Sequence, residues 1–279
     1  MEKGYPSSIF GKALIGVAGS WYPVLLGRSI DRVGKGLRSS PRDALIDDAC
    51  DASIRGRAFG FHRMMDTAGA VIGVALSGVV LWLYKNENDI AGVLRMVFGA
   101  ATIFAFCSLV VTLLVEEKQV LSPALHERSR EMGAYGYFSW SIRGLGREYW
   151  NTLAILTVFA FANSSDLFLL LKATDLGFSP LGGVMVYAWY NVTYAGLSYG
   201  AGKLSDSHGR WRIIIAGWIL YAVVYAGVAR ITTNVMLLWV LLGLYGIYMA
   251  LTEGVSKALI IDCVPAERKG LALSLLYMV

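Results

Sequence analysis

Long apolar runs separated by short polar segments are the feature that most restricts the fold of this chain. Residues 181–201 and 213–229 are two such runs, and the polar segment 202–212 joins them. Roughly 20 apolar residues in a helix cover the ~30 Å hydrocarbon core of a bilayer, so each run is long enough to cross it. Because lipid offers the backbone no hydrogen-bond partners, such runs predict transmembrane helices. Further helices are expected at 23–49, 56–84, 90–115, 150–171 and 235–261, with a shorter apolar segment at 6–19 and an apolar run that reaches Val279.

Composition places the whole chain in the membrane class. Hydrophobic residues make up 56% of it and charged residues only 16%, whereas soluble domains have roughly 25% charged residues. The net charge of +5 is spread over several short segments, so nucleic acid is not expected as a partner. Cys50, Cys107 and Cys263 lack metal-ligand spacing, and neither a metal nor another cofactor is expected. We therefore expect an all-α, polytopic transmembrane helical bundle.

Basic residues between the runs predict which side of the membrane each segment occupies. The segments 32–63, 116–149, 202–212 and 263–270 together hold seventeen Lys or Arg residues, and the alternate segments hold four. Cytoplasmic loops of membrane proteins carry an excess of Lys and Arg. The first group of segments is therefore expected in the cytoplasm.

The segment 202–212 has a recognisable spacing of residue types. Its glycines permit a sharp reversal of the backbone, and Asp206 is expected to cap the helix that follows. The pattern Gly-x-Leu-Ser-Asp-x-x-Gly-Arg resembles the signature loop of the major facilitator superfamily (MFS) of transporters, which recurs once in each half of a twelve-helix fold. This segment resembles the second copy, between the eighth and ninth helices. Ser207 and Trp211 stand where that family commonly has basic residues.

An internal repeat agrees with this resemblance. Shifting the chain by 214 residues aligns residues 43–48 with 257–262 and Gly56 with Gly270. A fixed offset that carries a helix end, a polar turn and the next helix start together is typical of a duplicated transporter half. The resemblance then implies a fragment covering roughly the third to eleventh helices of twelve. The expected domains are a partial N-terminal half at 1–115, a central cytoplasmic loop at 116–149 and a partial C-terminal half at 150–279.

Polar residues inside the predicted spans are candidates for a substrate or proton pathway. A charged side chain at the bilayer centre costs roughly 2.5–3.5 kcal/mol on insertion scales, so it needs a partner or a cavity. Glu253 and Lys257 are one helical turn apart and are expected to pair, while Asn163 and Asp166 are expected to share a helix face. For each charged residue the alternative is a structural ion pair between helices. In the family such helices line or border the central cavity, which implies Arg28, Asn163, Asp166, Glu253 and Lys257 as pathway candidates.

Charged residues near the predicted cytoplasmic ends are candidates for gating. His62 and Asp66 have i,i+4 spacing, and imidazole titrates near neutral pH, so this pair is either a proton relay or a gate contact. The gating loop consists of Gly202, Asp206, Gly209, Arg210 and Arg212, and further gating candidates are Arg38, Arg42, His62, Arg63 and Asp66.

These observations together predict a secondary active transporter of a small solute. It is expected to work by alternating access, to be coupled to protons, and to lie as a monomer in the plasma (inner) membrane, crossing it several times. One rival is a non-transporting sensor or structural membrane protein built on the same scaffold. A membrane enzyme is a second rival, but the chain has no Gly-x-Ser-x-Gly elbow, Walker loop or metal motif, so an enzyme is not expected.

Overall fold

The described part of the chain is entirely helical in its regular elements. The computed structural model describes residues 10–11, 13–16, 18–84, 90–113, 140, 142–163, 166–231 and 233–278, and at residues 32–38, 81, 90, 91, 94, 112, 113, 167, 180 and 181 it describes the backbone alone. Most of the expected central loop, 116–149, lies outside the described residues, as does the side chain of Arg38. The expected all-α class is confirmed.

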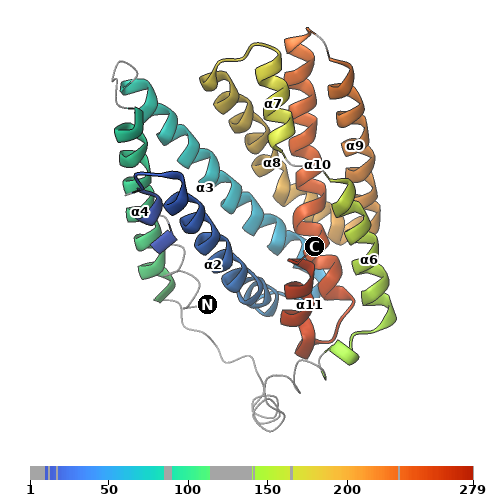
Figure 1. Ribbon diagram of the computed structural model, residues 1–279. Coiled ribbons are helices and arrows are strands. Elements are labelled where there is room, and N and C mark those ends of the chain that lie inside the picture. The colour runs from blue at the N-terminus through green and yellow to red at the C-terminus, as the bar shows by residue number, and fades with distance from the viewer. Residues whose placement is uncertain are drawn as a thin grey trace. The chain divides into compact units, whose positions relative to one another are not determined.

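The helices follow the predicted spans closely, as Figure 1 shows. Three of the described helical segments, Ala52–Val80, Arg210–Arg230 and Val235–Asp262, are long and apolar enough to cross a membrane. The elements are α2 (Trp21–Asp48), η1 (Ala52–Ile54), α3 (Arg55–Leu83), α4 (Ile90–Leu113), α6 (Arg147–Ala162), α7 (Leu167–Asp175), α8 (Pro180–His208), α9 (Arg210–Arg230), α10 (Val235–Asp262), η2 (Ala266–Arg268) and α11 (Lys269–Leu276).

The chain divides into two compact units. Residues 1–45 and 79–140 form one unit, and residues 46–78 and 141–279 form the other. The first unit therefore holds most of α2 and the whole of α4. The second holds η1, most of α3 and every described element from α6 onward, and it contains the contacts discussed below.

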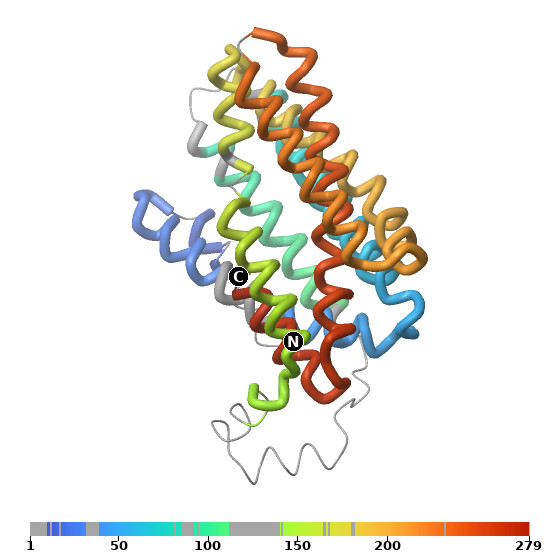
Figure 2. The backbone as a smooth tube through the Cα atoms, turned by 90° about the vertical axis from the view of Figure 1, so that its right-hand side faces the viewer, coloured from blue at the N-terminus to red at the C-terminus, as the bar shows by residue number. Residues whose placement is uncertain are grey.

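Helix α10 is the centre of the second unit. It packs against both α8 and α9, and the three helices run side by side in Figure 2. Their shared core includes Tyr190 of α8, Val224 of α9 and Leu242 of α10, all of which are buried. Apolar side chains also point outward, and Val158 and Phe161 of α6 are largely exposed. A surface of this kind suits contact with lipid tails.

The segment 202–212 is more helical than the sequence predicts. Helix α8 continues to His208 and α9 begins at Arg210, so Gly209 alone separates them. Gly209 has φ 94° and ψ 139°, and residues with a Cβ rarely adopt such a positive φ. The expected polar loop is therefore a one-residue hinge between two long helices, because the other polar residues of the segment accept helical geometry.

The 214-residue repeat is present in the structure as well as in the sequence. Helix α2 ends at Asp48 and α10 ends at Asp262, which is 214 positions later. The short helices η1 and η2 and the starts of α3 and α11 keep the same offset. A helix end, a one-turn 3-10 helix and a helix start are thus repeated without a shift of register.

Candidate functional site

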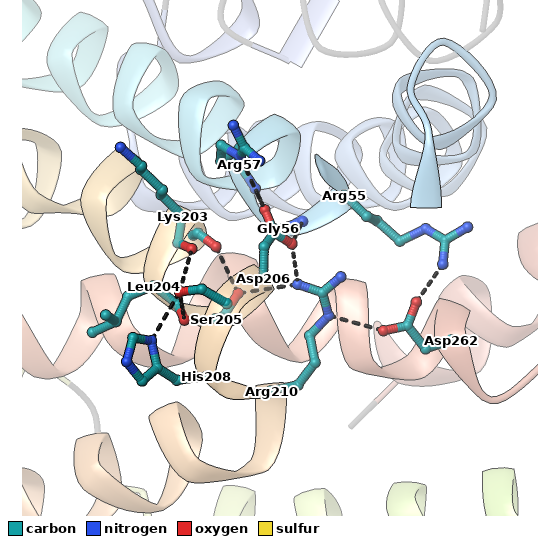
Figure 3. Close-up of polar contacts among 12 residues, drawn as sticks. Arg55, Gly56, Arg57, Lys203, Leu204, Ser205, Asp206, His208, Arg210 and Asp262 are labelled. Carbon is teal, nitrogen blue, oxygen red and sulfur yellow. Dashed lines mark hydrogen bonds and ion pairs between the residues drawn. The ribbon is translucent and has the colours of Figure 1, made fainter. Parts of the chain in front are cut away.

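Asp206 joins the end of α8 to the beginning of α3. Its carboxylate accepts hydrogen bonds from the backbone N–H groups of Gly56, at 2.8 Å, and Arg57, at 2.9 Å. Arg210 donates to the same carboxylate at 2.5 Å, and the Asp206 side chain is only 4% exposed (Figure 3). The N-terminal N–H groups of a helix have no partners within the helix, and its positive end attracts a carboxylate. Asp206 therefore caps α3, and the expectation that it caps the following helix is wrong because α8 continues past it.

A row of alternating charges extends from this cap. Arg210 donates to Asp262 at 2.8 Å, and Asp262 also pairs with Arg55. Arg55 in turn pairs with the buried carboxylate of Asp47, which also receives Lys269. These links join five elements, namely α2, α3, α9, α10 and α11. Each link joins a different pair of them. We call these residues, together with Asp206, the charge network.

The charge network reflects the internal repeat. Arg55, at the start of α3, pairs with Asp262, at the end of α10. The equivalent residues 214 positions away, Lys269 and Asp48, also approach each other, at 3.7 Å. One contact is therefore made twice, once in each direction between the repeated segments. Asp47 has Ile261 as its equivalent and has no symmetric counterpart.

Glycines bring α3 into backbone contact with α8. A Cβ atom added at Gly202 would lie 2.1 Å from the carbonyl oxygen of Gly56, and one at Gly60 would lie 2.5 Å from that of Ser198. Both distances are too short for any real Cβ contact. Close approach of this kind is the usual reason for small residues at helix interfaces in membranes. It places the N–H groups of α3 within reach of Asp206.

A second polar cluster surrounds Arg63 of α3. Its guanidinium donates to Glu253 of α10 at 2.8 Å, to Asp66 at 3.3 Å and to the hydroxyl of Tyr194 of α8. Glu253 thus forms an ion pair between helices, with Arg63 of α3. Lys257 is buried one turn further along α10, and its ammonium lies 5.2 Å from the centre of the Tyr277 ring.

Asp166 lies in a third cluster, at a break between α6 and α7. It accepts hydrogen bonds from the hydroxyls of Tyr245 of α10 and Tyr190 of α8, the second at 3.3 Å. Helix α6 ends at Ala162, so the predicted continuous helix at 150–171 is interrupted. Asn163 was expected to share a helix face with Asp166, but it lies in extended backbone and its side chain is exposed.

The remaining candidates lie on α2, α3 and α9 and at the hinge between α8 and α9. Arg28 is exposed on α2, and Arg212 is exposed at the start of α9. Arg42 pairs with its neighbour Asp43 at 2.9 Å. His62 is partly buried on α3, and Gly209 acts as the hinge described above.

The sequence indicates where many of the polar site residues lie, but not which residues they contact. In the sequence, Asp47 and Asp262 lie within the aligned segments of the repeat, and that alignment is the signal that could mark them. Tyr190 and Tyr245 are single aromatic residues in apolar runs. Nothing in their spacing indicates that both hydroxyls meet one carboxylate.

The fold and these clusters define a class: a polytopic helical membrane protein with an internal repeat and polar clusters between its helices. The family model described as Major Facilitator Superfamily matches residues 7–279. The chain belongs to the major facilitator superfamily, which makes it a multi-pass integral membrane protein of a transporter family.

One named relative agrees with this assignment. An uncharacterized MFS-type transporter of Methanocaldococcus jannaschii, MJ1317, is 32% identical over 99% of this chain and 66% of its own length. The chain thus spans slightly less than two thirds of that relative. Uncharacterized proteins of Mycobacterium tuberculosis (Rv2265) and Mycobacterium bovis (Mb2288) are 31% identical over 35% of this chain and 24% of their own lengths.

Proposed function

We propose that this protein is a secondary active transporter that moves a small solute across the plasma membrane by alternating access. In such a mechanism two halves rock around a central site, and polar contacts at one end hold one state closed. The charge network is the observation that carries the proposal, because it ties the start of α3 to the ends of α8 and α10 by contacts that can break and reform. The end of the bundle that contains Gly209 is then the cytoplasmic gate.

Proton coupling is part of the proposal. The carboxylates of Glu253 and Asp166 are the candidate proton acceptors, and a proton that binds either one changes the charge that must cross the membrane. Glu253 pairs with Arg63, so its protonation would release a contact between α3 and α10. Asp166 receives neutral hydroxyls. Transport in vesicles should then fall when a protonophore collapses the pH gradient.

Replacement of Asp206 tests the gate. Asp206→Ala removes a charge-assisted cap on two N–H groups, and such hydrogen bonds contribute roughly 1.5–3 kcal/mol each. A loss of that size changes the balance between closed and open states by at least ~10-fold. We expect full-length protein in proteoliposomes to transport at least ~10-fold more slowly, with faster hydrogen exchange at the amides of Gly56 and Arg57.

Ser207→Ala is the matched control, because among the described residues the Ser207 hydroxyl hydrogen-bonds only to the carbonyls of Lys203 and Leu204 and to the ring of His208. Its transport rate should stay within about twofold of wild type. If Asp206→Ala transports and exchanges like Ser207→Ala, the charge network is no gate. If no solute from a metabolite and drug panel accumulates in vesicles, the transport proposal itself is wrong.

A further inference from the structure

Helices α3 and α10 meet closely at two glycines. A Cβ atom added at Gly254 of α10 would lie 3.4 Å from the backbone nitrogen of Gly60 of α3. One added at Gly60 would lie 2.5 Å from the carbonyl oxygen of Ser198 of α8. Small residues let helix backbones approach closely within a membrane. The backbones of α3, α8 and α10 therefore come together at Gly60.

Two ion pairs between α3 and α10 lie on opposite sides of this contact. Arg55 and Asp262, at the start of α3 and the end of α10, belong to the charge network. Arg63 and Glu253 pair at 2.8 Å, eight residues into α3 and nine residues before the last residue of α10. At 1.5 Å per residue, this second pair lies ~12–14 Å from those helix ends. One pair thus joins the ends of the two helices, and the other joins them at depth.

The deeper pair belongs to a cluster that is one proton short of neutrality. Arg63 also donates to Asp66 at 3.3 Å, so one cation faces two carboxylates and the cluster carries a net negative charge. Ionised groups within a membrane protein are costly unless they are paired or reach water. The Glu253 side chain is 37% exposed, so a proton from water can reach it. Uptake of one proton makes the cluster neutral.

The two carboxylates differ in what happens to them when α3 and α10 move apart. Asp66 lies three residues from Arg63 on the same helix and stays beside it wherever α3 moves. Glu253 lies on α10 and loses Arg63. Because a carboxylate without a nearby cation holds a proton more tightly, Glu253 then takes up one proton from water and becomes a neutral carboxylic acid. By linkage, a proton on Glu253 favours the arrangement in which the two helices are apart.

The other titratable and charged groups around the pair come from the same three helices. They are His62 on α3, Tyr194 on α8, and Tyr248 and Lys257 on α10. Tyrosine and lysine ordinarily keep their protons at neutral pH. Imidazole titrates there, but a proton on His62 leaves Glu253 charged and paired. Glu253 is therefore the group whose protonation removes a contact between helices.

We propose that Glu253 is the site of the coupling proton and that Arg63 exchanges partners when the proton binds, an inference that rests on the proposed function. With Glu253 ionised, Arg63 joins α3 to α10. With Glu253 protonated, Arg63 is retained by Asp66 and α10 is released at depth. Because the charge network joins the ends of the same two helices, loss of the deeper pair weakens the closed state that the network holds.

Infrared spectroscopy of the full-length protein measures the proton directly, since a carboxylic acid and a carboxylate absorb at different frequencies. In wild type, part of the carboxylic-acid band should grow as the pH falls, and Glu253→Gln should lack that part. Arg63→Gln should keep it and raise its midpoint by about one pH unit, because no cation then competes with the proton. Glu148→Gln makes the same change at an exposed position of α6 and should titrate like wild type.

Spin labels report whether the helices follow the proton. Cysteines replacing Ser53 and His208, both exposed, place one label just before α3 and one at the end of α8, after the three native cysteines have been changed to Ser. In wild type, the ratio of long to short label distances should rise ~10-fold as the pH falls, which is what a difference of about one unit in proton affinity between the two states produces. Both Glu253→Gln and Arg63→Gln should show the long distance at every pH.

The two measurements together decide where the proton binds. A pH response that is lost in Asp166→Asn and kept in Glu253→Gln would assign the proton to Asp166 and overturn the inference. An unchanged infrared midpoint in Arg63→Gln would also overturn it, because Arg63 would then not compete with the proton. Proton binding at Glu253 that moves α3 without any solute transport in vesicles would contradict the proposed function and leave the inference standing. Transport that Glu253→Gln still couples to a pH gradient would do the reverse.

Discussion

At the scale of single residues, the contact between α3 and α8 depends on Gly202. A methyl group there would meet the carbonyl oxygen of Gly56 at 2.1 Å, and a backbone carbonyl cannot turn away as a flexible side chain can. Overpacking of this kind costs roughly 1–3 kcal/mol. We expect Gly202→Ala to lower the melting temperature of the detergent-purified protein by several degrees.

Gly200→Ala is the control for that substitution. Gly200 lies on the same helix two residues earlier, and no atom of the described residues lies within 4 Å of the position of an added Cβ. Alanine favours a helix over glycine by roughly 1 kcal/mol, so this variant should melt at the same temperature or higher. Opposite signs for the two substitutions are the expected result. Equal shifts would mean that α3 and α8 do not touch at Gly202.

At the scale of elements, the end of α6 depends on Tyr221. Tyr221→Phe removes the hydroxyl that donates to the carbonyl of Ala162 and leaves that carbonyl without this bond. A carbonyl left without a hydrogen-bond partner away from water costs roughly 1–3 kcal/mol. We expect a lower melting temperature and faster hydrogen exchange in the last turn of α6. Tyr199→Phe removes a hydroxyl from an exposed ring of α8 and should change neither, and equal effects of the two variants would contradict the role of Tyr221.

Helix positions could be predicted at this scale, but breaks and partners could not. The apolar length of each run sets the spans, and the 214-residue offset predicts that the ends of α2 and α10 correspond. The end of α6 at Ala162 could not be predicted, because residues 150–171 are apolar apart from a short polar stretch. In the structure, the helix ends at the residue whose carbonyl accepts a hydrogen bond from Tyr221 of α9. Glu253 has Lys257 one turn away but pairs with Arg63, 190 residues earlier in the chain. That choice depends on how α3 packs on α10, which local spacing does not encode.

At the scale of the whole molecule, the charge asymmetry predicts the sidedness of the bundle. Seventeen basic residues in one set of connecting segments against four in the other favour a cytoplasmic position for the hinge between α8 and α9. Single cysteines replacing His208 and Thr233, both exposed, report the two ends of α9. In intact cells a membrane-impermeant maleimide should label Thr233→Cys at once and His208→Cys only after permeabilisation.

The native cysteines set the conditions for that labelling experiment. Burial raises the pKa of the Cys50 thiol, and the nearby Asp47 carboxylate raises it further; burial likewise raises the pKa of the Cys263 thiol. Because the thiolate is the reactive form, both should react slowly at pH 7 and faster as the pH rises. A variant with Cys50, Cys107 and Cys263 replaced by Ser removes this background. If His208→Cys is labelled in intact cells and Thr233→Cys is protected, the orientation is the reverse of the predicted one. The charge network would then lie at the outer face, where it could not be a cytoplasmic gate.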